Sequence, residues 1–243
     1  MFSWFKKLRS SQRPYCAALV AAAGSSSRMG GVNKLMELLD GVPVLVRTLT
    51  ALEEARLVDE IIVACREEDL VEISRLCQEY GITKCTKVVR GGESRVHSVL
   101  LAALEAPPET ELLAVQDGAR PLVTPELIDR TISAAANCGA AAPAVPVKDT
   151  IKAVREDGAV AETLDRAALR AVQTPQVFEA SLLKAALQDA LEKNLPVTDD
   201  CSAVERLGKV VFLVEGDEEN LKITTPMDLV AAEAILQGRE VRA

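Results

Sequence analysis

Short apolar runs without polar interruption alternate along this chain with longer stretches in which apolar residues recur every three or four positions. Three of the runs are residues 16–23, 59–65 and 111–116. A continuous run of this kind is typical of a strand that is buried on both faces of a parallel sheet. The periodic stretches, such as 44–55 and 67–81, predict helices between the strands. The pattern therefore predicts an α/β fold with a mainly parallel sheet and right-handed crossovers.

One segment departs from this alternation. Residues 155–160, with the sequence REDGAV, predict a hairpin turn between two short extended arms. No repeat or low-complexity linker interrupts the chain elsewhere. We therefore expect an N-terminal tail over residues 1–14 and a single domain over 15–243, with a protruding β-arm over about 148–166.

Three polar loops follow predicted strands, at residues 24–34, 91–98 and 117–121. Ligands of open α/β sheets bind at the carboxyl ends of the strands, so we expect these loops to meet around one site. The first loop is rich in backbone N–H donors and carries the cations Arg28 and Lys34, which together suit a polyphosphate. A flexible Gly/Ser turn with two solvated cations remains the alternative.

The spacing of this loop excludes two common phosphate-binding motifs. Met29 stands where a P-loop has its second glycine, and Ser26 interrupts a dinucleotide-binding GxGxxG pattern. A phosphate site in this loop would therefore be neither a P-loop nor a dinucleotide-binding loop.

Composition narrows the class of protein further. With 243 residues, of which 49% are hydrophobic, the chain can fill a sizeable core. A net charge of −8 argues against nucleic acid as a partner. Six cysteines without a CxxC pair and a single histidine, His97, give no zinc site and are typical of a reducing cytoplasm. No apolar run in the N-terminal segment is long enough for a membrane span, so we expect no membrane partner.

Several motifs occur in order along the pattern: AAAGSSSRMG followed by NK, GGESRVHSV, QDGARP, VPVKDTIK, LDR, QTPQVF, TDDCSAVE and VEGDEENLKITTP. Together they resemble the 2-C-methyl-D-erythritol 4-phosphate cytidylyltransferase family of the non-mevalonate isoprenoid pathway, over about residues 16–238. The resemblance implies a Rossmann-like sheet with helices on both faces, and a β-arm that exchanges contacts across a homodimer.

The resemblance also implies an activity: transfer of CMP from CTP to 2-C-methyl-D-erythritol 4-phosphate, with release of pyrophosphate and with Mg²⁺ as the cofactor. Two alternatives stay open. One is another polyol-phosphate cytidylyltransferase, such as an enzyme acting on ribitol 5-phosphate. The other is a non-catalytic nucleotide-binding protein on the same fold.

Site residues follow from the same resemblance. The cations that would stabilise the charged transition state are Arg28, Lys34 and Lys222. The nucleotide would be bound by Ala22, Ala23, Gly24, Ser25, Gly92, Ser98, Asp117 and Gly118. The polyol phosphate would be bound by Arg120, Thr150, Thr174, Thr198 and, from the partner subunit, Arg166. Because it stands at a strand end, Asp117 is also the expected carboxylate for the metal.

The chain departs from the family pattern at three of these loops. Asn33 stands where proline is common, and His97 stands where an acidic residue is common. Gln116 replaces a usual histidine before Asp117. For Asp117 a simpler interpretation stays open, since an aspartate before Gly118 also suits a plain turn.

Overall fold

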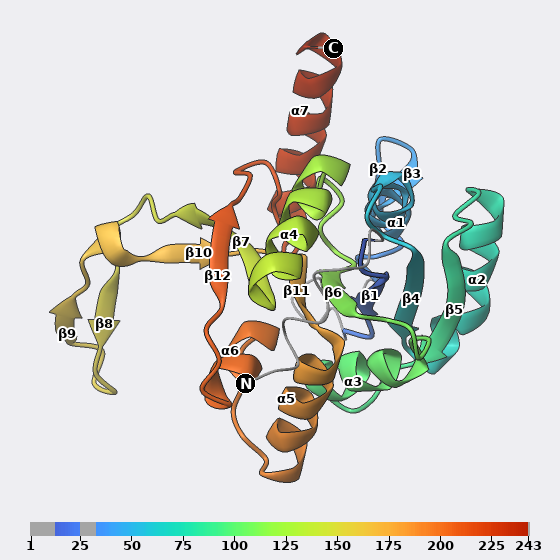
Figure 1. The fold of residues 1–243 in the computed structure, drawn as a ribbon. Coiled ribbons are helices and arrows are strands. Elements are labelled where there is room, and N and C mark those ends of the chain that lie inside the picture. The colour runs from blue at the N-terminus through green and yellow to red at the C-terminus, as the bar shows by residue number, and fades with distance from the viewer. Residues whose placement is uncertain (1–12, 25–32, 243) are drawn as a thin grey trace.

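A computed structural model describes residues 13–24 and 33–242 of the chain (Figure 1). One eight-stranded sheet forms its centre, with the strand order β10-β7-β11-β6-β1-β4-β5 and with β12 paired to β7. These strands are β1 (Cys16–Ala22), β4 (Glu60–Cys65), β5 (Cys85–Arg90), β6 (Leu112–Asp117), β7 (Ala140–Pro146), β10 (Arg170–Val172), β11 (Gln176–Glu179) and β12 (Phe212–Glu215).

The predicted α/β fold with a mainly parallel sheet is confirmed. β1 pairs in parallel with both β4 and β6, β4 pairs in parallel with β5, and β12 pairs in parallel with β7. Two strands run the other way: β11 is antiparallel to β6 and β7, and β10 is antiparallel to β7. The sheet is therefore mixed at its β7 end, which the apolar runs alone do not predict.

Helices cover both faces of the sheet (Figure 1). On one face lie α1 (Val44–Glu54), α2 (Leu70–Glu79), α4 (Pro125–Cys138) and α7 (Pro226–Arg242). On the other lie α3 (Arg95–Glu105), α5 (Ala180–Glu192) and α6 (Asp200–Arg206). Each face of the sheet packs against an apolar core, and alternate residues of β1 point to opposite faces. Val20 packs in the core on the first face and Leu19 in the core on the second. This burial on both faces explains the unbroken apolar run.

Local signals fix where the helices begin. Thr124 Oγ1 accepts a hydrogen bond from Leu127 N at 3.2 Å and starts α4, and Ser94 accepts one from His97 N at 3.1 Å and starts α3. Asp199 starts α6 by a capping box with Ser202. Such caps satisfy N–H groups that have no partner inside the helix. The caps therefore determine the residues at which α3 and α6 begin beside the sheet.

The predicted hairpin is confirmed as well. β8 (Lys152–Val154) and β9 (Val160–Thr163) form a separate two-stranded sheet that projects from the body of the molecule (Figure 1). Gly158 takes the left-handed backbone conformation of the turn, with φ at +81°. The side chains of Val154 and Val160 are 64% and 55% exposed, so the arm presents apolar surface to solvent in the single chain.

Shorter elements are not predicted by the sequence pattern. β2 (Leu38–Leu39) and β3 (Val42–Pro43) form a two-residue ladder, too short to show any periodicity. Most of the predicted tail lies outside the described residues, but Arg13 forms an ion pair with Asp59 at 2.6 Å. All six cysteines are free thiols. Among the described helices, none has the length and apolar character needed to cross a membrane.

Candidate active site

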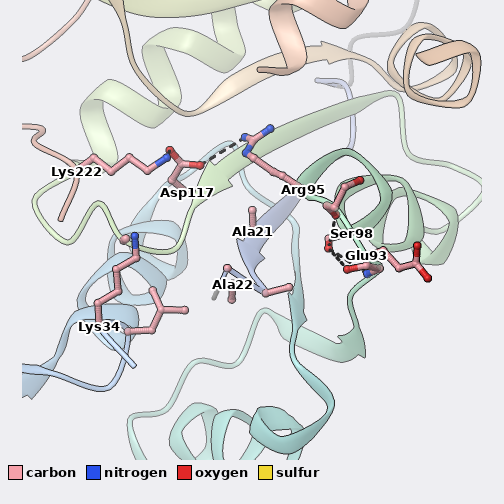
Figure 2. A pocket seen from close by; sticks show the side chains of 14 residues that line it. Ala21, Ala22, Lys34, Glu93, Arg95, Ser98, Asp117 and Lys222 are labelled. Atoms are coloured by element: carbon pink, nitrogen blue, oxygen red, sulfur yellow. Dashed lines mark hydrogen bonds and ion pairs between the residues drawn. The ribbon is translucent and has the colours of Figure 1, made fainter. Parts of the chain in front are cut away.

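Gly24 and Lys34, the described ends of the first polar loop, meet residues of the other two loops at a pocket of about 290 Å³ beside the carboxyl ends of β1 and β6 (Figure 2). Lys34 and Lys222 lie on one side, Glu93 and Ser98 on the other, and Asp117 lies between them. The structure brings eight of the predicted site residues to this pocket: Ala22, Ala23, Gly24, Lys34, Gly92, Ser98, Asp117 and Lys222. Two predicted residues, Ser25 and Arg28, lie outside the described residues.

Three further predicted residues lie next to the pocket and support Asp117. Thr174 is buried, and its Oγ1 accepts a hydrogen bond from Asp117 N at 3.1 Å. The Arg120 Nε lies 3.6 Å from Asp117 Oδ2, and its Nη1 donates to Asn220 O at 2.6 Å. A Cβ at Gly118 would lie 3.1 Å from Leu45 Cδ1, so α1 packs directly against this turn.

Three other predicted residues are not brought to the pocket within the single chain. Thr150 is exposed at the base of the arm. Arg166 is also exposed, donates from Nη1 to Lys148 O at 2.8 Å, and lines a surface hollow with Arg170. Thr198 is exposed just before α6, where its backbone N–H donates to Ser202 Oγ at 3.1 Å.

Asp117 is the electrostatic centre of the pocket. Its side chain is 9% exposed; Lys222 Nζ lies 2.8 Å from Oδ2, and Arg95 Nη2 lies 3.4 Å from Oδ1. Burial by itself would raise the pKa of Asp117, but the charges of Arg95, Lys222 and Arg120 outweigh it and lower the pKa to about 2. The carboxylate is therefore ionised at neutral pH and gathers three cations around the pocket.

Arg95 and Asp200 are the residues that the sequence analysis missed. The side chain of Asp200 is fully buried, and its Oδ2 lies 2.8 Å from Arg95 Nη2. Burial raises the pKa of Asp200, and the charge of Arg95 opposes that rise. Both residues lie inside recognised motifs, GGESRVHSV and TDDCSAVE, but each stands at the start of a helix, where a charge usually faces solvent. Nothing in the spacing of the motifs pairs them.

The wall opposite Lys34 is built by close backbone approach. A Cβ at Gly91 would lie 2.7 Å from Ala23 Cβ and 2.8 Å from Ser98 Oγ, and a Cβ at Gly92 would overlap the His97 ring. Ser98 Oγ accepts from Gly92 N at 3.0 Å and donates to Ser94 O at 2.8 Å. These contacts hold the turn before α3 against the end of β1, so the pocket wall is formed before any ligand binds.

Cations concentrate at this pocket although the protein as a whole is acidic. Lys34, Lys222 and Arg95 line it, and Arg120 lies behind it. In the described part of the chain, no three His, Cys, Asp or Glu side chains gather closely enough to form a metal site of their own. The arrangement therefore suits a polyanion, with one carboxylate able to share a cation that the ligand brings.

A cationic pocket at the carboxyl ends of β1 and β6, lined by alanine and glycine, on a mainly parallel α/β sheet is suited to a nucleotide, and the match to a family model makes the protein a nucleotidyltransferase. The chain belongs to the 2-C-methyl-D-erythritol 4-phosphate cytidylyltransferase family, whose model matches residues 16–238. The family resemblance expected from the ordered motifs is thereby confirmed.

Individual relatives agree with this membership. The 2-C-methyl-D-erythritol 4-phosphate cytidylyltransferase of Bacillus cytotoxicus is 47% identical over 219 residues, which cover 90% of this chain and 96% of the relative. A 4-diphosphocytidyl-2C-methyl-D-erythritol synthase crystal structure from Anaerococcus prevotii superposes with a TM-score of 0.83 at 31% identity, covering 92% and 96% of the two chains. The Thermus thermophilus cytidylyltransferase structure has a TM-score of 0.74 at 34% identity, covering 92% and 99%.

The buried Arg95–Asp200 pair gives a stability prediction. We expect Arg95→Met to lower the free energy of unfolding by about 3 to 5 kcal/mol, because Asp200 is left buried without its cation. Arg95→Met/Asp200→Leu should recover most of this loss, since Asp200 is gone and the buried Asp117 keeps Lys222 and Arg120 as partners. Urea unfolding at neutral pH measures both variants.

The matched control is Arg75→Met on the surface of α2, where Arg75 pairs with exposed Glu72 and Glu79. This change should cost less than about 1 kcal/mol. Because burial raises the pKa of Asp200, its protonated form is favoured in the folded state, so the deficit of Arg95→Met should shrink as the pH falls. An Arg95→Met variant as stable as Arg75→Met would contradict the role given to this pair.

Proposed function

We propose that the protein transfers CMP from CTP to 2-C-methyl-D-erythritol 4-phosphate and forms 4-diphosphocytidyl-2-C-methyl-D-erythritol and pyrophosphate. The observation that carries the proposal is the pocket itself, in which Lys34 and Lys222 face an ionised Asp117 at the strand ends. The printed names of the relatives, which cover about nine tenths of the chain, support the choice of substrates.

The chemistry is an in-line attack of a phosphomonoester oxygen on the α-phosphorus of CTP, with pyrophosphate as the leaving group. The attacking phosphate is already ionised at neutral pH, so the step needs no general base. Its main obstacle is the repulsion between two polyanions and the charge that spreads over the phosphoryl oxygens. Lys34, Lys222 and, from the segment outside the described residues, Arg28 are the groups that would stabilise this charge.

The wall opposite these cations is suited to the nucleoside. The small residues Ala22, Ala23 and Gly24 leave room for a planar base and a close ribose. Ser25, which lies outside the described residues, is assigned to the nucleotide with them. Gly92 and Ser98 form the anchored turn beside them, with their backbone groups held in place by the Ser98 hydroxyl. We assign this wall to the cytidine and the side with Lys34 to its phosphates.

Asp117 is the residue that would hold Mg²⁺. A single ionised carboxylate that lines a phosphate pocket fits this ion, which is commonly bound through one or two carboxylates, waters and the phosphates of the substrate. When bound, the ion would neutralise part of the charge on the phosphates. Arg95, Arg120 and Lys222 keep Asp117 ionised and oriented toward the pocket.

The polyol phosphate is assigned to residues from two chains. Arg120 and Thr174 lie beside Asp117. Thr198 precedes α6. Arg166 and Thr150 do not reach the pocket of their own chain, and the arm beside them exposes apolar surface. We infer that residues 15–243 act as one domain and that the arm, about 148–166, pairs two copies so that Arg166 serves the site of the partner subunit.

Free thiols support a cytoplasmic setting for this reaction, since four of the six cysteines are buried and none is paired. A second candidate substrate, ribitol 5-phosphate, would use the same cationic chemistry. A direct comparison of the two polyol phosphates as substrates, and not the geometry of the pocket, distinguishes ribitol 5-phosphate from 2-C-methyl-D-erythritol 4-phosphate.

A pyrophosphate-release assay tests the proposed function. With CTP, we expect rapid release in the presence of 2-C-methyl-D-erythritol 4-phosphate and little release with ribitol 5-phosphate or without a polyol phosphate. Preference for ribitol 5-phosphate would reassign the substrate. CTP binding without pyrophosphate release from any of these mixtures would identify a non-catalytic nucleotide-binding protein.

The same assay tests the metal. Because the pocket offers oxygen ligands and no Cys/His cluster in the described part of the chain, we expect activity to depend on a divalent ion and to be highest with Mg²⁺. Excess EDTA should abolish turnover, and Mg²⁺ added beyond the chelator should restore it. Full activity in excess EDTA would contradict the proposed requirement for a divalent ion.

Mixed dimers test the shared site. Lys34→Ala should be nearly inactive, since the loss of one electrostatic contact to the transition state commonly costs about 2.7 to 4 kcal/mol. Arg166→Ala should also be nearly inactive at limiting polyol phosphate, because it removes a cation that binds the attacking phosphate. In a heterodimer of the two variants, one site carries both lesions and the other carries neither. Activity should therefore reappear on mixing and approach half the wild-type value per heterodimer.

If Arg166 acted within its own chain, every site of the heterodimer would keep one lesion. Co-purification of two differently tagged variants establishes that heterodimers have formed. Inactive heterodimers would contradict the shared site and would mean that Arg166 acts at the surface of its own subunit.

A further inference from the structure

Lys34 stands between two anchored neighbours. Leu35 is 4% exposed in the core, and its carbonyl accepts a hydrogen bond from Leu45 N at 2.9 Å, at the start of α1. Asn33, on the other side of Lys34, has a polar side chain that makes contacts in two directions. The backbone of Lys34 is therefore fixed from both sides, although a lysine side chain itself has many rotamers.

The Asn33 side chain joins this segment to a distant part of the chain. Its Nδ2 donates to both carboxylate oxygens of Asp69, at 3.2 and 3.3 Å. Its Oδ1 accepts from Leu35 N at 3.3 Å, and its backbone carbonyl accepts from Met36 N at 2.9 Å. One side chain thus sets the local turn and also ties it to a second element.

Asp69 is itself held firmly. It is 9% exposed and lies at the end of the short helix η3 (Glu67–Asp69). Arg66 Nε donates to its Oδ2 at 2.8 Å, and Arg66 Nη2 donates to its Oδ1 at 3.1 Å. This two-point contact fixes the plane of the carboxylate. Because Arg66 directly follows β4, the chain around Asn33 is fastened to the sheet.

We propose that Asn33 and Asp69 form a latch that positions Lys34 in the pocket, with Arg66 holding the Asp69 carboxylate in place. The inference rests on the proposed function, in which Lys34 stabilises the charged transition state. Neither Asn33 nor Asp69 lines the pocket, so both are positioning residues and act through Lys34. Displacement of a catalytic group by about 1 Å can cost as much as 100-fold in rate, so a latch of this kind acts on turnover more than on substrate affinity.

Asn33→Asp tests the latch with almost no change of side-chain volume. The new carboxylate lacks the donor and faces the carboxylate of Asp69. We expect kcat to fall by about tenfold, while KM for CTP and the melting temperature change little. Asn33→Asp/Asp69→Asn restores a donor and an acceptor in exchanged places, and the amide oxygen at position 69 can still accept from Arg66. Its kcat should return to within about threefold of the wild-type value.

Two further variants separate positioning from a general structural effect. Adding Asn33→Asp to Lys34→Ala should leave the residual single-turnover rate unchanged, because the residue through which the latch acts is gone. Asp129→Asn is the matched control: Asp129 also joins two segments, by accepting from Leu57 N at 2.9 Å and Arg56 N at 3.1 Å, but it does not line the pocket. It should leave kcat unchanged.

The outcomes distinguish the latch from the proposed function. A wild-type protein inactive in the pyrophosphate assay would overturn both. With an active wild type, a normal kcat in Asn33→Asp, the absence of recovery in the exchanged variant, or a further loss in the Lys34→Ala background would each overturn the latch alone.

Discussion

A buried carboxylate surrounded by cations is the interaction on which the rest of this site depends. Asp117 ends β6 and draws together Arg95 from α3, Lys222 from the segment before α7, and Arg120 from the turn that follows. A carboxylate buried there without cations would not stay ionised, because desolvation would raise its pKa until it was protonated. The elements that deliver the cations are therefore fixed around the end of a single strand, and the pocket between them is open to an anion.

The second buried carboxylate explains why α6 belongs to this arrangement. Asp200 holds Arg95 from behind at 2.8 Å while Asp117 faces it at 3.4 Å, so one guanidinium is shared between two acids. Asp117 thus stays ionised among Arg95, Lys222 and Arg120 at the end of β6.

Much of this could be predicted from the sequence, because strands buried on both faces leave unbroken apolar runs and because parallel strands end at one edge. That logic led from residues 16–23 and 111–116 to the pocket around Asp117. It could not pair Arg95 with Asp200, since two charged residues at helix starts have no periodic signal and meet only through tertiary packing. β10, with three residues, is likewise too short to show a period, and its pairing with β7 is set by the chain that surrounds it.

The concentration of cations in one pocket has a kinetic consequence, since the chain carries a net charge of −8. The net negative charge disfavours the approach of anionic metabolites, whereas Lys34, Lys222 and Arg95 attract them locally, so the electric field steers diffusing anions toward the pocket. Screening limits the range of this guidance to about 8 Å at physiological ionic strength. Productive encounters are therefore decided within the last few water layers before contact, where the cations that line the pocket act directly on the anion.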